Sequence, residues 1–272
     1  MSKLGRSKRA TCAIRAVLFD MGGTLEDIYY DDALRLKATR GLREIMLKRN
    51  VDPGLTIPDL YATIIAGMKK YQDWREDTEV ELPVERVWAE YVFPCQNLPQ
   101  DRLADAAEEL AVYYDNYFYP RRLRPQAREL LDALRAKGYR LGVISNVISR
   151  GQVPLNLKAY GLEHYFDAVV ISSGLGWRKP NARIFLEAAH QLGLAPAACA
   201  YVGDTVSRDV AGARRAGYGL SIQIKSFLTE KADRGTDTEK PDAVISDLMQ
   251  VIDVVTKANE EQASVQHQRN LF

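Results

Sequence analysis

Short apolar runs that stop abruptly at a polar residue or a glycine recur through most of the chain. The first run covers residues 16–19 and leads directly to Asp20, which Gly22 and Gly23 closely follow. Uninterrupted apolar runs of this length are typical of strands that are buried on both faces of a parallel sheet. Similar runs predict further strands at residues 141–144, 168–171, 200–202 and 220–224, and a weaker one at 243–245.

Between these runs the apolar spacing changes to that of amphipathic helices. Helices are predicted from Pro125 to Gly138, near residues 152–160, after Pro180, before Gly217, and from the last strand to about Lys257. Strands that alternate with helices at this spacing require right-handed crossover connections. The pattern therefore predicts an α/β fold with a doubly wound parallel sheet, that is, a Rossmann-like core.

A long segment after the first strand has a different character. It loses the β-branched runs, and its apolar residues recur at helical spacing. Four helices are predicted at residues 33–47, 58–73, 83–92 and 100–117. This helical region is therefore an insertion between the first strand and the rest of the sheet.

Composition narrows the classes of function. The chain has 272 residues, of which 46% are apolar, so it can bury a sizeable core, and its net charge of +1 gives no overall attraction to nucleic acid or membranes. No segment approaches the roughly 18 uninterrupted apolar residues of a membrane span, and the basic first residues lack the apolar run of a secretory signal. Three scattered cysteines are typical of reduced thiols in a cytoplasmic protein. The oligomeric state stays open.

Carboxylates follow two of the predicted strands. Asp20 ends the first run, Asp204 follows the run at 200–202, and Asp209 lies a few residues further on. Ligands of open α/β sheets bind outside the carboxyl ends of the strands. Carboxylates that converge there repel each other unless a cation lies among them, and oxygen ligands favour Mg²⁺.

The neighbouring residues suit a phosphoryl group. Ser145 and Asn146 follow the second core strand, and Ser145 supplies a hydroxyl and a strand-end amide. Lys179 supplies a positive charge, and Gly22 and Gly23 allow backbone amides to approach an anion. With a divalent ion present, Asp20 could attack phosphorus and form an aspartyl phosphate.

These residues also form four ordered motifs that resemble those of the haloacid dehalogenase-like hydrolase superfamily. The motifs are Phe-Asp-Met-Gly-Gly-Thr-Leu at 19–25, Val-Ile-Ser-Asn at 143–146, Lys-Pro at 179–180, and the segment from Gly203 to Ala213. The resemblance covers about residues 14–225, and the inserted helices resemble the α-helical cap domain of this superfamily. It implies a catalytic core (13–27 and 120–258) and a cap (28–119), with hinges near residues 26–29 and 119–123. The charged first residues predict a flexible basic arm (1–12), and the polar composition of the last residues predicts a polar tail (259–272).

The resemblance also implies a role for each motif residue. Asp20 would be the nucleophile, and Ser145 and Lys179 would bind the phosphate. Asp204 and the carbonyl of Gly22 would bind Mg²⁺ together with Asp20, and Asp209 would orient Lys179. The function implied is that of a Mg²⁺-dependent phosphatase acting on a small phosphorylated metabolite.

One position departs from the superfamily pattern. Phosphatases of this kind usually carry a second aspartate two residues after the nucleophile, as proton donor, and here that residue is Gly22. Three interpretations stay open: a phosphatase that obtains the proton elsewhere or uses a good leaving group, a dehalogenase or phosphonatase, and a catalytically weak binder of a phosphorylated ligand or a protein. Asp204 speaks against a dehalogenase, and the retention of Asp20 and Lys179 speaks against an inactive binder, so phosphatase ranks first.

Overall fold

A six-stranded parallel sheet forms the centre of the protein. The computed structural model describes residues 12–227, 229 and 239–269. The strands of the sheet are β1 (Ala16–Phe19), β4 (Arg140–Ser145), β5 (Ala168–Ile171), β6 (Cys199–Gly203), β7 (Leu220–Ile224) and β8 (Ala243–Ile245). Their order is β5-β4-β1-β6-β7-β8, and every neighbouring pair is parallel. The predicted α/β class and all six predicted strands are confirmed.

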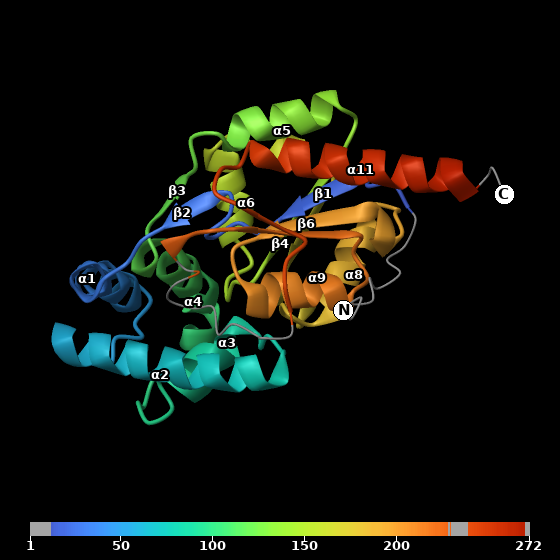
Figure 1. The fold of residues 1–272 in the computed structure, drawn as a ribbon. Helices are drawn as coiled ribbons and strands as arrows, with labels where there is room; N and C mark the ends of the chain where they lie inside the picture. The colour runs from blue at the N-terminus through green and yellow to red at the C-terminus, as the bar shows by residue number, and fades with distance from the viewer. Residues whose placement is uncertain (1–11, 228, 230–238, 270–272) are drawn as a thin grey trace, which may run out of the picture.

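Helices cover both faces of this sheet, as Figure 1 shows. On one face lie α5 (Ala127–Ala136), α6 (Gln152–Ala159) and α11 (Gln250–Arg269), whose apolar side chains share one core with β1 and β4. On the other face lie α8 (Ala182–Gln191) and α9 (Ala211–Arg215), which pack in a second core. β1 and β6 are buried along their whole length and β4 from Leu141 onward, which explains the apolar runs of these central strands.

The inserted helices form a bundle with its own apolar core. They are α1 (Asp32–Lys48), α2 (Ile57–Thr78), α3 (Val84–Arg86), η1 (Val87–Val92), α4 (Gln100–Tyr113) and η2 (Tyr114–Phe118). Side chains of Asp31 and Thr56 cap the first two helices by accepting hydrogen bonds from backbone amides. Trp88 is fully buried between helices and donates its indole N–H to the carbonyl of Ala107 at 3.0 Å. The four predicted helical segments are confirmed.

The two chain crossings between bundle and sheet run side by side. β2 (Glu26–Ile28) and β3 (Arg121–Leu123) pair as an antiparallel ribbon, with Ile28 opposite Arg121. These segments were expected as hinges and not as strands, because three residues are too few to show a periodic pattern.

A second attachment joins the bundle to the sheet region. The segment after α2 forms an antiparallel bridge between Val80 and Trp177. The amide of Glu81 donates to the carbonyl of Gly176 at 3.0 Å, and the amide of Arg178 donates to the carbonyl of Glu79 at 3.1 Å. This backbone pairing leads directly into Lys179.

The predicted end of the last helix near Lys257 is wrong, because α11 continues to Arg269. The side chain of Asn259 fastens this helix by accepting from the amide of Ile14 at 2.7 Å and donating to its carbonyl at 3.2 Å. Most of the predicted polar tail therefore belongs to a helix. Residues 1–11 of the predicted basic arm lie outside the described residues. Within the described parts of the chain, no helix is both long and apolar enough to cross a membrane.

Smaller elements complete the fold: η3 (Glu163–Tyr165), α7 (Ser172–Leu175), η4 (Pro196–Ala198) and η5 (Val206–Val210). Of these, α7 lies directly after β5 and η5 begins two residues after Asp204. Both therefore stand at the carboxyl-terminal edge of the sheet, where the polar residues of the sequence motifs gather.

Candidate active site

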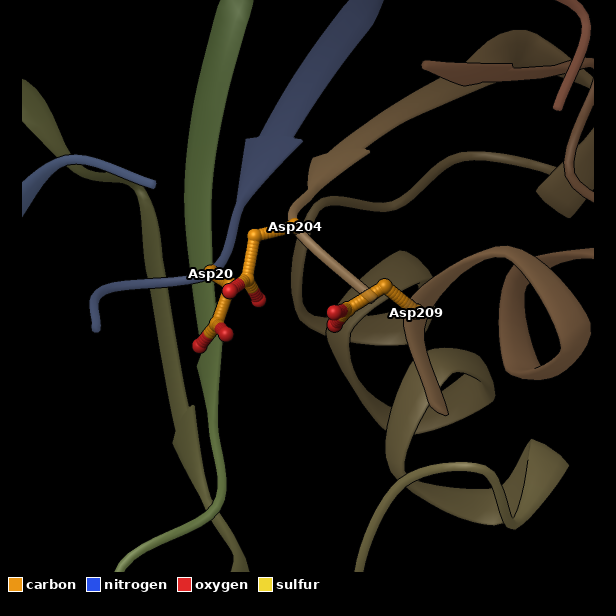
Figure 2. A group of neighbouring side chains, drawn as sticks. All are labelled: Asp20, Asp204 and Asp209. Atoms are coloured by element: carbon orange, nitrogen blue, oxygen red, sulfur yellow. The ribbon is translucent and has the colours of Figure 1, made fainter. Parts of the chain in front are cut away.

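Asp20 and Asp204 follow neighbouring strands. β1 and β6 pair in parallel with Phe19 opposite Val202, and the amide of Asp20 donates to the carbonyl of Val202 at 2.9 Å. Figure 2 shows the two carboxylates close together at the strand ends, with Asp209 pointing toward them from η5. An oxygen of each of the three lies within 4.8 Å of the others. The predicted convergence of the three aspartates is thus observed in the structure.

Lys179 lies inside this acidic cluster and is 2% exposed. Its Nζ is 2.9 Å from Asp20 Oδ1 and 2.8 Å from Asp209 Oδ1, and it donates to the hydroxyl of Tyr201 at 2.9 Å. The other oxygen of Asp209 accepts from the amide and the hydroxyl of Thr205 at 3.0 and 2.6 Å. Both oxygens of Asp209 are therefore engaged, and this residue holds Lys179 in place.

The charges decide how the aspartates ionise. Burial would raise the pKa of Asp209, but the charges of Lys179 and Arg208 and the hydrogen bonds to its oxygens outweigh burial and lower it. Burial raises the pKa of Asp20, and the charge of Asp209 adds to this effect, while Lys179 opposes it. Burial and the charges of Asp209 and Asp20 raise the pKa of Asp204 to about 7. The positive charge of Lys179 therefore does not fully compensate the negative charges of Asp20, Asp204 and Asp209.

Asp204 carries the clearest sign of a missing partner. Its Oδ2 accepts from the hydroxyl of Ser226 at 2.6 Å, but its Oδ1 is buried and has no hydrogen-bond partner among the described residues. An unpaired buried carboxylate oxygen is costly, and a cation between Asp20 and Asp204 would satisfy it. The donor set is made of oxygen atoms, which hard cations prefer.

Ser145 and Asn146 lie at the end of β4 and line the same cavity as Asp20. The side-chain amide of Asn146 donates to the carbonyl of Lys179 at 3.0 Å and accepts from its amide at 2.9 Å. Asn146 therefore fixes the backbone that carries Lys179, and both ends of its side chain are engaged. Its predicted contact with substrate stays a prediction.

The two glycines of the first motif play different parts. Gly22 lines the cavity. Gly23 does not, and its amide donates to the carbonyl of Glu26 at 2.8 Å. Gly23 has a φ of +84°, and a Cβ there would lie 2.4 Å from Asp204 Oδ2. Its role here is thus to allow the turn and the close approach of Asp204.

A cavity of about 280 Å³ lies between the helical bundle and the strand ends, next to Asp20 and Ser145. The acidic side chains that line it are Asp20 and Asp115. Its basic lining residues are Arg35, Lys69, Arg75, Arg121, Lys179 and Arg208. This excess of positive charge suits an anionic ligand.

Several residues of the site were not predicted from the sequence. Tyr201 is buried on β6, where its hydroxyl accepts from Lys179 and donates to the carbonyl of Ile144 at 3.1 Å. A tyrosine inside an apolar strand signals a hydroxyl that needs partners, so this residue could have been found. Arg121 comes from β3, and only the folded chain brings it to the site.

The sequence and the fold of this chain resemble those of known proteins. The family model for haloacid dehalogenase-like hydrolases matches residues 14–217. The chain is 31% identical to a glyceraldehyde 3-phosphate phosphatase of Methanopyrus kandleri, over 89% of this chain and 97% of the relative. It is 32% identical to a phosphoglycolate phosphatase of Nitrosococcus oceani, over 59% of this chain and 70% of the relative. The chain belongs to the haloacid dehalogenase-like hydrolase family.

A solved 2-haloacid dehalogenase of Pseudomonas syringae pv. Tomato DC3000 shares the fold with a TM-score of 0.61. The two proteins are 23% identical, and the match covers 90% of this chain and 99% of that one. This likeness concerns the fold alone.

Proposed function

We propose that this protein is a Mg²⁺-dependent phosphatase of small phosphorylated metabolites that works through an aspartyl phosphate on Asp20. The observation that carries the proposal is the meeting of Asp20 with Lys179, 2.9 Å apart, at a cavity rich in cationic side chains. Relatives named glyceraldehyde 3-phosphate phosphatase and phosphoglycolate phosphatase support a small phosphate ester as substrate.

The metal would be held by Asp20 and Asp204, with the backbone carbonyl of Gly22 as a further ligand. The unpartnered Oδ1 of Asp204 supports this assignment. Asp209 has both oxygens engaged by Lys179 and Thr205, so it would support the site from behind. When bound, Mg²⁺ neutralises the charge between the carboxylates and polarises the phosphoryl oxygens.

The chain's own residues orient the nucleophile. Oδ1 of Asp20 accepts from the amide of Met21 at 2.7 Å and contacts Lys179, so the rotation of the carboxylate is fixed. Lys179 and Ser145 would bind phosphoryl oxygens. In the first step a bond forms between Asp20 and phosphorus while the ester P–O bond breaks. In the second step water cleaves the aspartyl phosphate, which releases phosphate and restores Asp20.

The helical bundle would act as a cap that restricts the substrate. The cavity of about 280 Å³ lies just below the usual range of about 300–1,000 Å³ for ligand pockets. Tyr30 and Tyr119 line its cap side, and the guanidinium of Arg35 lies over both rings, 3.9 and 4.6 Å from their centroids. This small, cationic space favours a metabolite of a few carbon atoms over a macromolecule.

The test is phosphate release from a panel of small phosphate esters, acyl phosphates, phosphonates and haloacids, with and without Mg²⁺. We expect Mg²⁺-dependent release from phosphate compounds, and loss of turnover by at least about 10³-fold in Asp20→Asn, since the nucleophile is removed. Asp253→Asn, which changes an exposed aspartate on α11, is the matched control and should retain activity. Phosphate release that survives in Asp20→Asn, or turnover restricted to haloacids or phosphonates, would overturn the proposal.

A further inference from the structure

The space that a side chain at position 22 would take is already filled. A Cβ on Gly22 would lie 2.6 Å from Ile28 Cδ1 and 3.1 Å from Arg121 Nη1. Ile28 and Arg121 stand opposite each other in the β2–β3 ribbon. The ribbon therefore places a guanidinium group beside the residue two positions after Asp20.

Arg121 is held there by a buried anion. Its Nη1 donates to Glu26 Oε2 at 3.1 Å, and its Nε donates to the carbonyl of Asp115 at 2.8 Å. Glu26 is fully buried, and its other oxygen accepts from Asn156 and Tyr160 of the sheet region at 2.8 and 3.0 Å. Every oxygen of Glu26 thus has a partner, and the guanidinium plane is fixed from two sides.

One nitrogen of Arg121 is left for a ligand. Its side chain is 9% exposed and lines the cavity that contains Asp20. Nε and Nη1 are engaged, and Nη2 has no hydrogen-bond partner in the described chain. A preorganised cationic donor therefore stands at the edge of the cavity beside Gly22.

We propose that Arg121 is a catalytic residue that stabilises the leaving-group oxygen as an anion, in place of a proton donor at position 22. This proposal rests on the proposed phosphatase function. As the bond between Asp20 and phosphorus forms, the ester P–O bond breaks and the leaving oxygen keeps the electron pair. Arg121 donates a hydrogen bond to that oxygen, which takes its proton from water after it departs.

This role has a consequence that a carboxylic acid donor would not have. A guanidinium remains protonated throughout the accessible pH range, so it supplies charge and a hydrogen bond but transfers no proton. Its contribution grows with the charge that develops on the leaving oxygen. Alkyl phosphates, whose leaving groups are weakly acidic, therefore depend on Arg121 more than aryl phosphates do.

The experiment measures kcat/KM for a series of aryl and alkyl phosphates and plots its logarithm against the pKa of the leaving alcohol. Arg121→Met should reduce turnover of alkyl phosphates about 10²- to 10³-fold and that of 4-nitrophenyl phosphate several-fold, so the slope steepens. Arg121→Lys should restore part of the alkyl phosphate turnover. Arg35→Met, which removes another cationic lining residue, should change all substrates by a similar factor and leave the slope unchanged.

A second variant controls for loss of stability in Arg121→Met. Removal of Arg121 alone leaves the buried charge of Glu26 without its cationic partner, which destabilises a protein strongly. Glu26→Gln combined with Arg121→Met removes both charges and retains a side-chain carbonyl for Asn156 and Tyr160. This double variant should show the same steepened slope.

The outcomes separate the two proposals. If the unchanged protein hydrolyses none of the phosphates, the proposed function fails. If it hydrolyses them through Asp20 and the slope is the same in both Arg121 variants, only the role of Arg121 is overturned. A slope that steepens in Asp115→Asn and not in Arg121→Met would assign proton donation to Asp115, the other acidic residue of the cavity lining, and would also overturn it.

Discussion

A buried charge cluster lies between the helical bundle and the sheet, and it gives a stability prediction. Glu81 is 3% exposed and accepts from the hydroxyls of Tyr71 and Ser172 at 2.6 and 2.8 Å. It pairs with Arg75 at 3.3 Å and with Arg178 at 4.0 Å. Burial and the charge of Arg75 lower the pKa of Arg178 to about 9, so this guanidinium is poorly compensated even while Glu81 is charged.

Glu81→Gln removes the anion with which both Arg75 and the buried Arg178 pair. Loss of one partner from a buried ion pair costs about 3–5 kcal/mol of unfolding free energy, and the retained hydrogen bonds of glutamine place the expected value near the lower limit. Glu79, two residues earlier, pairs with Arg215 at only 2.7 Å, but the two side chains are 26% and 51% exposed. Because exposed pairs contribute about 1 kcal/mol or less, Glu79→Gln should cost less despite the shorter distance.

Urea denaturation of both variants at pH 7 measures this difference in unfolding free energy. Burial would raise the pKa of Glu81, but the charges of Arg75 and Arg178 and two hydrogen bonds outweigh burial and lower it below 4.5. A lowered folded-state pKa stabilises the protein above the unfolded-state value, and this stabilisation is lost as the pH falls through the folded-state pKa. The gap between the unchanged protein and Glu81→Gln should therefore be full at pH 7 and shrink below about pH 4.5. Equal costs for the two variants would refute the reasoning.

Two further variants test the surroundings of Asp20 and Lys179. Asn146→Ala removes two hydrogen bonds to the backbone of Lys179. Steady-state kinetics should show kcat lowered about tenfold, and urea unfolding should show a loss of about 1–2 kcal/mol of stability. An unchanged kcat would contradict the role of Asn146 in positioning Lys179. Gly22→Asp should lower the unfolding free energy by about 1–3 kcal/mol, because the new Cβ would lie 2.6 Å from Ile28 Cδ1. Adding Ile28→Val should recover part of that loss in the same unfolding assay. A Gly22→Asp variant as stable as the unchanged protein would show that Ile28 moves aside without cost.

The site residues that could be predicted from the sequence lie at or shortly after the end of a predicted strand. Asp20 and Asp204 follow apolar runs directly, so the parallel sheet alone brings them together. Lys179 lies eight residues after the end of β5 and reaches the cluster through a backbone that Asn146 holds in place. That clamp joins segments 33 residues apart and has no local pattern.

The residues that the sequence did not reveal depend on pairing across the chain. Glu26 and Arg121 are 95 positions apart and meet through a ribbon of three-residue strands. Each is a charged residue in a segment without a recognisable motif, so the sequence alone does not predict that either belongs to the site. The end of α11 was misjudged for a related reason, because Asn259 is polar but anchors the helix to Ile14, 245 positions away.

The backbone pairing between residues 79–81 and 176–178 connects movement of the helical bundle to the position of Lys179 beside Asp20. The bundle is attached both at the β2–β3 ribbon and at this pairing, so it cannot swing away about the ribbon without parting the main-chain bonds of Glu81 and Arg178. Since Arg178 immediately precedes Lys179, any such opening pulls on the ammonium group that neutralises Asp20. If the bundle opens for substrate to enter or phosphate to leave, the same main-chain hydrogen bonds that help to position Lys179 would break and form again in each cycle.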